Sequence, residues 1–481
     1  MKNMTLKNIA QAVGGVLHAE MLPPGISVDG TEVRSVVLDS RLVEEGGVFI
    51  ATRGEHVDGH SFISQVFEAG VIGVICEKAP EQPKGAYILV ENSFQALKDL
   101  AEYYRSQFDI KVVGITGSVG KTSTKEFVAS VLAQKYCVLK TEGNYNNEVG
   151  LPLTVLRIRE GCEIAVLEMG ISDFGEMHRL SKIAKPDVCL ITNIGQCHLE
   201  NLGTRDGILK AKTEIFDFMQ EGGQICLNGD DDKLIAIREV RGSVPVFFGV
   251  GSNNAVYADN YENCGLVGSR AQIHMKGLAG VEERSFEAEI PLPGEHMLCN
   301  ALAATAVGMI FGLTPGQIQA GIREVQAVDG RSHVIRTDRL TLIDDCYNAN
   351  PVSMKAALDL LHMTELSKAP EESAYSHETT RKVAVLGDMF ELGADEAALH
   401  REVGVYAAEK QIDVLVCVGE LCRYMYEGAG DMHSETRCYY FKEKEALAAQ
   451  INAIIHDGDL VLVKASHGMH FEELIEKFIH S

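Results

Sequence analysis

Short apolar runs rich in β-branched residues recur along the chain, and most of them end in glycine or in polar residues. Between residues 109 and 327, the runs KVVGITG, EIAVLEMG and DVCLITNIG each lead into a glycine-containing turn or a polar stretch. Continuous apolar strands of this kind are typical of a parallel sheet that is covered on both faces. The pattern therefore predicts a central α/β unit with a parallel sheet over residues 109–327.

Two further α/β units flank the central one. Residues 1–108 contain the β-like runs VIGVICE and AYILVEN among polar helical stretches. Residues 328–481 contain LTLIDD, KVAVLGD, DVLVCVG and DLVLVKAS, which end on polar residues as in a Rossmann-like, doubly wound sheet. The polar stretch 365–382 is expected to be an exposed loop. The predicted fold is thus α/β with three domains.

Length and charge narrow the possible functions. A chain of 481 residues suits about three domains. Its 44 basic and 68 acidic residues give a formal net charge of −24, which argues against binding to nucleic acid or to anionic membranes. An anionic substrate must therefore meet a local cluster of hydrogen-bond donors.

Cysteine usage and hydropathy indicate the compartment. The twelve cysteines include no C-x-x-C pair, and several stand inside apolar runs, which is typical of reduced, buried thiols in the cytosol. The start, MKNMTLKNIAQAVGG, lacks the apolar core of a signal peptide, and no apolar run is long enough to span a membrane. We expect a cytoplasmic monomer without a membrane span.

The strongest local motif is GITGSVGKTSTKE at 114–126, between a predicted strand and a predicted helix over 123–136. Glycines let backbone N–H groups turn toward phosphate oxygens, and a helix N-terminus favours negative charge. Lys121 would reach the β- and γ-phosphates of ATP, and the Thr122 hydroxyl would bind Mg²⁺. The plain alternative is a glycine turn with a solvated lysine, and Ile115 stands where the strict Walker pattern has glycine. The residues expected to bind the nucleotide are Gly117, Ser118, Val119, Gly120, Lys121, Thr122 and Ser123.

Downstream residues offer a metal site. Glu168 ends an apolar run, and a carboxylate at the carboxyl end of a strand beside a phosphate loop suits Mg²⁺. His198 follows the next strand, and Lys210 and Lys212 lie on a predicted helix. Taken singly, each has an ordinary alternative: a solvated acid, a histidine without a special role, and a solvated helix lysine.

Polar residues near the C-terminal unit are candidates for contacts with nucleotide and substrate. His296 and Asn300 share a helix face, where an asparagine amide can pair with adenine or be an ordinary polar residue. Arg331 offers a guanidinium fork to the γ-phosphate. The YNANP string at 347–351 is a compact polar cluster or simply a turn. Its candidate substrate-binding residues are Tyr347, Asn348 and Asn350.

Two segments nearer the N-terminus are candidates for binding a second substrate besides ATP. The stretch 35–63 contains Ser40 and Arg41, and the charge of Arg41 suits a nucleotide or its pyrophosphate, although a surface arginine is the plain alternative. The segment GNYNNEVGLPLT supplies further amide donors for a substrate in the cleft. These are Asn144, Asn146 and Asn147.

Along nearly its whole length the sequence resembles the Mur ligases. Their phosphate loop, T-G-x-x-G-K-T, matches residues 116–122, and E-M-G, I-T-N-I, H-L-E and A-K-x-E-I follow in order. The N-terminal D-S-R, G-x-x-F-x-A and G-x-x-x-D-G-H strings also match, while Met297 departs from the family's G-x-H-N-x-x-N pattern. YNANP, GDMFELG (387–393) and LHREVG (399–404) resemble the branch that adds D-alanyl-D-alanine, whereas the branch adding the third amino acid usually carries H-T-P-D.

The resemblance implies a reaction and roles for residues. ATP would lie between the central and C-terminal domains, and UDP-N-acetylmuramoyl-tripeptide between the N-terminal and central ones. The tripeptide carboxylate would attack the γ-phosphate to give an acyl phosphate, which the amine of D-alanyl-D-alanine then attacks. Lys121, His198 and Lys212 would be catalytic. With two Mg²⁺ ions expected, the implied roles are Glu168 and His198 on the second ion, Lys212 as a carbamate ligand, Asn300 on adenine and Asp345 on ribose.

One position departs from the family and two alternative functions stay open. The family commonly writes K-G-S-R near its last strand, where this chain has Lys464-Ala465-Ser466-His467. One alternative is a related ligase that adds a single amino acid, or glutamate to a folate. The other is a P-loop switch or transport ATPase, which would hydrolyse ATP without a carboxylate acceptor.

Overall fold

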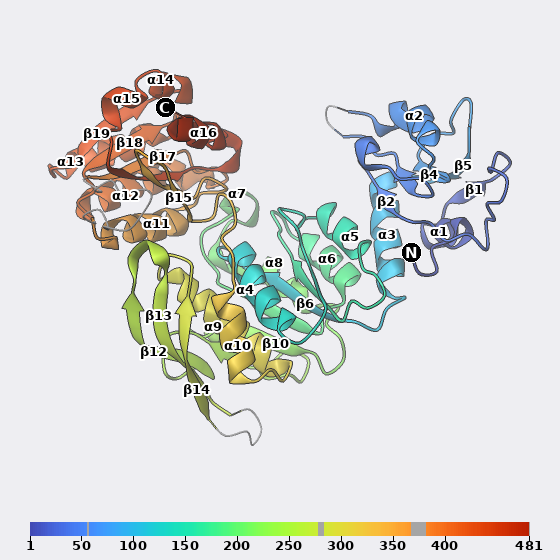
Figure 1. The fold of residues 1–481 in the computed structure, drawn as a ribbon, viewed down its shortest axis with the longest axis horizontal. Coiled ribbons are helices and arrows are strands. Elements are labelled where there is room, and N and C mark those ends of the chain that lie inside the picture. The colour runs from blue at the N-terminus through green and yellow to red at the C-terminus, as the bar shows by residue number, and fades with distance from the viewer. Residues whose placement is uncertain (55–56, 278–282, 367–380, 481) are drawn as a thin grey trace.

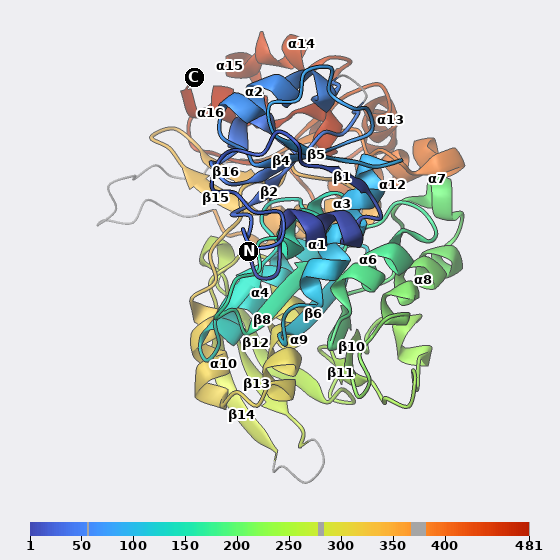
Figure 2. The same cartoon turned by 90° about the vertical axis from the view of Figure 1, so that its right-hand side faces the viewer.

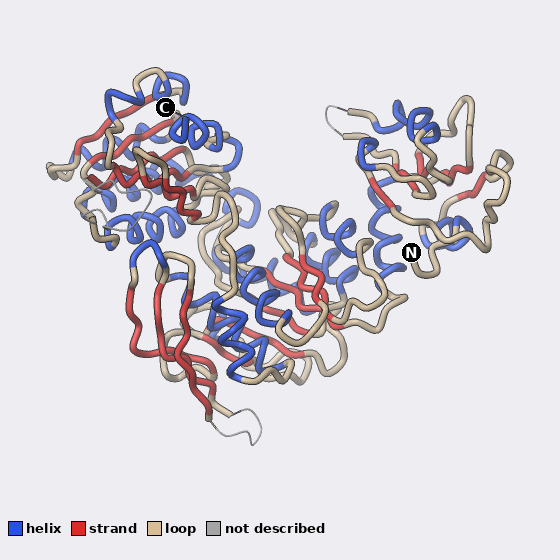
Figure 3. The backbone as a smooth tube through the Cα atoms, in the orientation of Figure 1, coloured by secondary structure: helices blue, strands red, loops and turns tan. Residues whose placement is uncertain are grey.

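The computed structural model describes residues 1–54, 57–277, 283–366 and 381–480. Three α/β units follow one another along a crescent, with the N-terminal and C-terminal units at opposite ends of the central one (Figure 1). Each unit has its own group of strands (Figure 3). The predicted α/β class with three domains is confirmed.

The N-terminal unit is built on a sheet with the strand order β1-β5-β4-β3-β2. Its strands are parallel except for β1, which pairs antiparallel with β5. The elements are β1 (Val16–His18), β2 (Val36–Val37), β3 (Val48–Ile50), β4 (Gly73–Cys76), β5 (Ala86–Leu89), α1 (Leu6–Ala12), α2 (Ile63–Glu68) and α3 (Ser93–Arg105).

The central unit contains a sheet with the order β14-β13-β12-β11-β10-β9-β6-β8-β7. Its strands are β6 (Lys111–Thr116), β7 (Val138–Lys140), β8 (Ile164–Glu168), β9 (Val188–Ile191), β10 (Gln224–Asn228), β11 (Val246–Phe248), β12 (Val256–Asn263), β13 (Ser269–Met275) and β14 (Arg284–Ile290). Its helices are α4 (Lys121–Ala133), α5 (Gly150–Val155), α6 (Glu176–Ala184), α7 (Leu199–Leu202), α8 (Arg205–Thr213), α9 (His296–Ile310) and α10 (Pro315–Arg323).

The prediction of a parallel central sheet is only partly correct. Strands β6 to β12 pair in parallel, but β12, β13 and β14 form an antiparallel extension. This extension lies beside the end of the parallel part in both views (Figures 1 and 2). Buried and exposed residues alternate along β13 and β14, as in antiparallel strands with one face in water. The prediction rested on the continuous apolar runs and missed this alternation.

Helices cover the parallel part of the central sheet on both faces. On one face α4, α9 and α10 pack together around a buried cluster that includes Phe127, Val131 and Ile318. On the other face α5, α6 and α8 contribute to a second cluster. This double cover explains why the interiors of β6, β8 and β9 are apolar and buried.

The C-terminal unit contains a sheet with the order β15-β16-β20-β17-β18-β19, parallel except for β15. Of the predicted loop 365–382, residues 367–380 lie outside the described residues. The elements are β15 (His333–Arg336), β16 (Thr341–Asp344), β17 (Arg381–Gly387), β18 (Val414–Val418), β19 (Arg437–Phe441), β20 (Asp459–Lys464), α11 (Pro351–Met363), α12 (Glu396–Glu409), α13 (Cys422–Asp431), α14 (Lys444–Ala448), α15 (Ile451–Ile454) and α16 (Glu472–His480).

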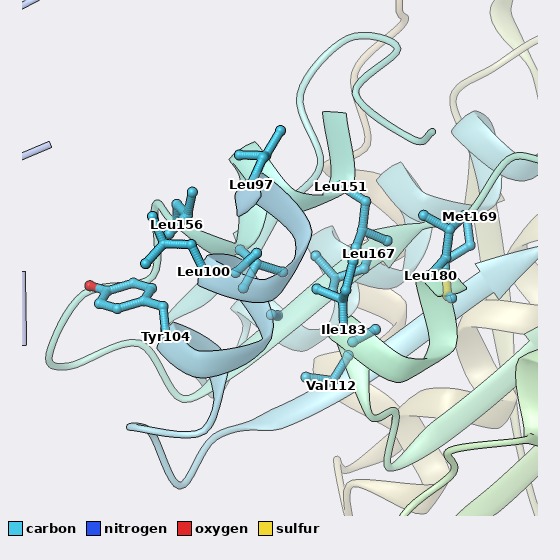
Figure 4. Packing of buried hydrophobic residues seen from close by; sticks show 14 of the residues in the cluster. Leu97, Leu100, Tyr104, Val112, Leu151, Leu156, Leu167, Met169, Leu180 and Ile183 are labelled. Atoms are coloured by element: carbon cyan, nitrogen blue, oxygen red, sulfur yellow. The ribbon is translucent and has the colours of Figure 1, made fainter. Parts of the chain in front are cut away.

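Helix α3 joins the N-terminal unit to the central one. Its Leu97, Leu100 and Tyr104 lie beside apolar residues of α5 and α6 (Figure 4). The Tyr104 hydroxyl donates to the Ile158 carbonyl over 2.6 Å. The buried Arg105 guanidinium donates to three backbone carbonyls, one of them on α6. The two units therefore share one apolar core. No helix in the described ranges has the length and apolar character needed to cross a membrane.

Candidate active site

A cavity of about 500 Å³ lies between the central unit and the C-terminal unit. Its walls include residues at the carboxyl ends of β6, β8, β9 and β16, the edge at which ligands gather in open α/β sheets. The predicted site residues that line it are Ser118, Val119, Gly120, Lys121, Thr122, Ser123, Asn146, Asn147, Glu168, His198, Arg331, Asp345, Tyr347, Asn348 and Asn350.

The phosphate loop between β6 and α4 is held in shape by the segment that follows β9. The Val119 N–H donates to Asn193 Oδ1 over 2.9 Å, and the Thr192 hydroxyl donates to the Val119 carbonyl over 2.6 Å. Gly117 has φ of 148°, and a Cβ there would lie 1.9 Å from Thr192 Oγ1, so this position requires glycine. Sequence reasoning gave no role to Thr192 or Asn193. Both belong to the I-T-N-I string of the family resemblance, but neither residue type by itself indicates a particular chemistry.

Helix α4 begins at Lys121, directly behind the loop, and residues 120–123 line the cavity. The first N–H groups of a helix have no partner within the helix, and they carry the positive end of its dipole. The Lys121 ammonium folds back over the loop and donates to the Gly117 carbonyl over 3.0 Å. The loop therefore offers backbone donors and a cation to phosphate oxygens.

Glu168 ends β8 beside the phosphate loop with a side chain that is 1% exposed. Its Oε1 accepts from the Thr122 hydroxyl over 3.2 Å and from Asn146 Nδ2 over 2.7 Å. Its Oε2 has no hydrogen-bond donor among the described residues. Lys125 Nζ lies 3.8 Å from that oxygen, in a side chain that is also 1% exposed. Sequence reasoning missed Lys125, although a lysine one helical turn after Lys121 marks the same helix face.

This arrangement suits Mg²⁺. In the described part of the chain, no three His, Cys, Asp or Glu side chains gather closely enough to hold a metal ion by themselves. Mg²⁺ at phosphate-transfer sites usually takes one or two carboxylates and completes its shell with phosphate oxygens and water. The buried Glu168 Oε2, which accepts no hydrogen bond from the described residues, and the neighbouring Thr122 hydroxyl supply ligands of that kind.

Lys212 on α8 is fully buried, and its Nζ has no hydrogen-bond partner among the described residues. Burial lowers the pKa of this amine from 10.5 to about 8, and the charge of Lys121 acts in the same direction. The neighbouring Lys210 instead lies over the Phe174 ring at 5.6 Å. Lys212 does not itself line the cavity.

His198 precedes α7 in a left-handed backbone conformation with φ of 52°, and it lines the cavity. Its Nδ1 forms an ion pair with Glu391 of the C-terminal unit. Sequence reasoning missed Glu391, which lies inside the GDMFELG string but is far from His198 in the chain.

Arg331 reaches from the C-terminal unit to the phosphate loop. Its guanidinium donates to the Thr122 hydroxyl over 3.2 Å and lies 3.8 Å from the centre of the Tyr347 ring. The His467 ring also stacks on Tyr347, with ring centroids 5.4 Å apart. Burial raises the pKa of Tyr347, so its hydroxyl stays protonated at neutral pH. Arg331 therefore stands where it can bind phosphate oxygens on the loop.

Asp345 already has partners in this structure. Its carboxylate pairs with Lys464 Nζ over 2.6 Å and accepts from the Ser332 N–H over 3.1 Å. The side chain of Lys464 is 2% exposed, and it also donates to the Asn348 carbonyl. Sequence reasoning quoted Lys464 only for its motif and missed this pair. The signal was a lysine at the end of an otherwise apolar strand.

Two predicted substrate-binding asparagines accept hydrogen bonds from the first turns of helices. Asn350 is the N-cap of α11, and its Oδ1 accepts from the Ser353 N–H; Asn147 Oδ1 accepts from the Gly150 N–H at the start of α5. The stretch 347–350 leads directly into α11. Both asparagines also line the cavity. Asn144 does not line it.

Asn300, Ser40 and Arg41 are not brought to the cavity. Asn300 is buried behind the phosphate loop, where its Oδ1 accepts from the Thr124 hydroxyl over 2.9 Å. Arg41 in the N-terminal unit pairs with its neighbour Asp39, and its side chain is 85% exposed. The N-terminal unit stands away from the C-terminal unit across the central one (Figure 1).

Comparison with known proteins gives three family matches in chain order. The Mur ligase family catalytic domain matches residues 32–105, and the Mur ligase middle domain matches residues 115–308. The Mur ligase glutamate ligase domain matches residues 330–467. Each match covers most of the strands of one sheet.

Relatives of known name and structure align over almost the entire chain. The UDP-N-acetylmuramoyl-tripeptide--D-alanyl-D-alanine ligase of Bacillus subtilis is 38% identical, with 100% of this chain and 99% of the relative covered. The ligase of the same name from Escherichia coli is 33% identical over 96% of each chain. A crystal structure of MurF from Acinetobacter baumannii superposes with a TM-score of 0.86 at 32% identity, covering 99% of both chains. A Thermotoga maritima MurF structure in complex with ADP has a TM-score of 0.77 at 30% identity, covering 93% of this chain and 97% of that one. The chain therefore belongs to the Mur ligase family of ATP-dependent amide ligases.

Proposed function

We propose that this ligase joins D-alanyl-D-alanine to UDP-N-acetylmuramoyl-tripeptide in the synthesis of a peptidoglycan precursor. The observation that carries the proposal is the full-length match to relatives of that name, at up to 38% identity. The cavity agrees with it, because the YNANP string faces the phosphate loop across the space where two substrates would meet. We further propose that the protein works in the cytoplasm as a monomer, with domains at 1–108, 109–327 and 328–481.

The reaction proceeds in two steps. An oxygen of the tripeptide carboxylate attacks the γ-phosphorus of ATP, the bond to the β,γ-bridging oxygen breaks, and ADP leaves. The free amine of D-alanyl-D-alanine then attacks the acyl carbon of the acyl phosphate. Inorganic phosphate leaves, the nitrogen loses a proton, and the amide bond is complete.

Lys121 and Arg331 stabilise the transferring phosphoryl group. Both side chains contact the phosphate loop from opposite domains, so their charges converge where negative charge develops. Gly117, Gly120 and the start of α4 supply backbone donors to the same phosphates.

Mg²⁺, when bound, would neutralise phosphate charge and polarise the reacting oxygens. Thr122 and Glu168 would hold one such ion, and Glu168, His198 and a carbamylated Lys212 would serve the second. Lys212 supports this assignment because its buried amine has no partner among the described residues. An ordinary ammonium there would repel a cation, whereas a carbamate is an oxygen ligand of the kind Mg²⁺ prefers.

The remaining roles concern the bases, the sugar and the peptide. Asn300 on adenine and Asp345 on ribose would each have to exchange a present partner, Thr124 and Lys464 respectively, or bind alongside it. The predicted substrate contacts from the other units are Ser40, Arg41, Asn144, Asn146 and Asn147. Because Ser40 and Arg41 stand outside the cavity, we propose that the N-terminal unit approaches it when substrate binds.

One assay tests the function and separates it from its alternatives. Release of phosphate from ATP is measured with UDP-N-acetylmuramoyl-tripeptide, with and without D-alanyl-D-alanine, and the peptide product is identified by mass. The proposal requires turnover that depends on both acceptors. Turnover with a single amino acid in place of the dipeptide would indicate another Mur ligase, and turnover without any carboxylate would indicate a P-loop ATPase.

A further inference from the structure

The C-terminal unit makes a charged contact with a predicted metal ligand of the central unit. Glu391, in the loop after β17, forms an ion pair with His198 Nδ1. A second contact lies beside this ion pair. Gly393 packs against the backbone of Glu200 in α7, and a Cβ added to Gly393 would lie 3.5 Å from that backbone.

The loop that carries Glu391 is fixed by the core of its own unit. The Met389 N–H donates to the fully buried His400 Nε2 over 2.9 Å, and the Phe390 N–H donates to the Ser466 hydroxyl over 2.9 Å. Glu391 itself has φ of 62°, a left-handed conformation that a glutamate adopts at a cost. The GDMFELG string therefore supplies the loop, and the LHREVG string supplies His400, which holds the loop in place.

The chemistry of the pair is specific. The Glu391 carboxylate lies beside Nδ1, which has no hydrogen-bond partner elsewhere among the described residues, so the contact leaves Nε2 available for a ligand. Histidines that bind metals commonly donate their other ring N–H to such a carboxylate, which orients the ring and raises its basicity. His198 lines the cavity, so its ring is held at the wall where the second metal ion is proposed.

We propose that Glu391 is the positioning residue for His198, so that the second metal site is complete only when the C-terminal domain is docked on the central one. The inference rests on the proposed function, in which His198 binds that metal ion. Docking and metal binding then favour each other, because linkage between two equilibria is reciprocal.

The test measures metal binding instead of turnover. Mn²⁺ is titrated into the protein with ADP, and free Mn²⁺ is followed by electron paramagnetic resonance. The variants are Glu391→Ala, Glu391→Gln, His198→Ala and, as the matched control, Glu200→Ala. The Glu200 side chain is an exposed acid on the same surface, and it forms no ion pair or hydrogen bond with other described residues. Melting temperatures confirm that each variant is folded.

We expect Glu391→Ala to weaken the second Mn²⁺ about 10-fold to 100-fold while the first is unchanged. Glu391→Gln, which keeps an acceptor oxygen, should fall between it and the wild type, and Glu200→Ala should match the wild type. If His198→Ala weakens the second ion but Glu391→Ala does not, the role of Glu391 is overturned while the metal site stands. If neither weakens it, His198 is not a ligand, and the metal assignment of the proposed function fails as well.

Discussion

Replacing Lys212 with alanine removes the buried amine and leaves the rest of α8 in place. We expect this change to abolish most ligase activity, because the proposed carbamate is a ligand of the second Mg²⁺. A small added carboxylate such as formate or acetate should restore part of the activity by taking the vacated position beside the metal ion. Lys210→Ala is the matched control, since Lys210 packs on Phe174 away from the cavity.

The pKa of Lys212 determines what fraction of its amine can react with CO₂ at a given pH. CO₂ reacts only with the neutral amine, and a pKa of about 8 leaves about 10% of the amines neutral at pH 7. At the unperturbed value of 10.5 that fraction would be about 0.03%, so burial raises the reactive fraction about 300-fold. The neutral fraction climbs about tenfold per pH unit below pH 8 and levels off above it.

This dependence can be measured directly. Enzyme stripped of CO₂ at low pH is returned to buffers of different pH at one fixed partial pressure of CO₂, and recovery of activity is timed. The initial recovery rate should rise with pH up to about 8 and then become constant. Carbon-13 NMR with labelled CO₂ should show a carbamate signal in the wild type and in Lys210→Ala, but not in Lys212→Ala.

Two results would refute the reasoning. One is a Lys212→Ala enzyme with activity near that of the wild type. The other is a crystal structure of the closed, substrate-bound enzyme in which the Lys212 amine carries no added oxygens.

Other predictions address the phosphate loop, the position His467 at which the chain departs from the family motif, and the acceptor dipeptide. Lys121→Ala should lose turnover with an unchanged melting curve, because its charge is needed only against phosphate, and an active variant would contradict the loop assignment. If His467 holds the anionic substrate, His467→Arg, which carries a permanent charge, should lower the KM for that substrate; an unchanged KM would show that the position is not essential. D-alanine should be a far poorer acceptor than D-alanyl-D-alanine, since unpaired buried polar groups cost about 1–3 kcal/mol each; equal kcat/KM values would remove the dipeptide from the function.

The parts of the fold that could be predicted are those with a local signal. The strand before Gly117 and the helix after Lys121 follow from apolar periodicity and glycine placement, and β16, β17, β18 and β20 follow from short apolar runs. The antiparallel strands β13 and β14 carried a period-two signal that continuous runs do not show. The central sheet was therefore predicted too simply.

The residues of the site also divide into those with a local sequence signal and those without one. Glu168 and the phosphate loop could be placed together because the carboxyl ends of neighbouring strands meet at one edge. Glu391 and Lys464 could not be assigned to His198 and Asp345, because those pairs join residues more than a hundred positions apart. Capping of α11 by Asn350 was not predicted, because the YNANP string was interpreted only as a polar cluster or a turn, although an asparagine before proline also suits a helix start.

Helix α3 limits how the molecule can be dissected. By sequence it closes the N-terminal unit, yet its Leu97, Leu100 and Tyr104 belong to the same buried cluster as residues of α5 and α6. A fragment that begins at residue 109 lacks α3, so the apolar residues of α5 and α6 that α3 covers would be exposed to water. Such a fragment should aggregate or fail to express. The buried clusters of the C-terminal unit, in contrast, contain only residues from 340 onward. Protease nicking near residue 328 should therefore release a folded C-terminal fragment, while the two units before it survive only as a single piece.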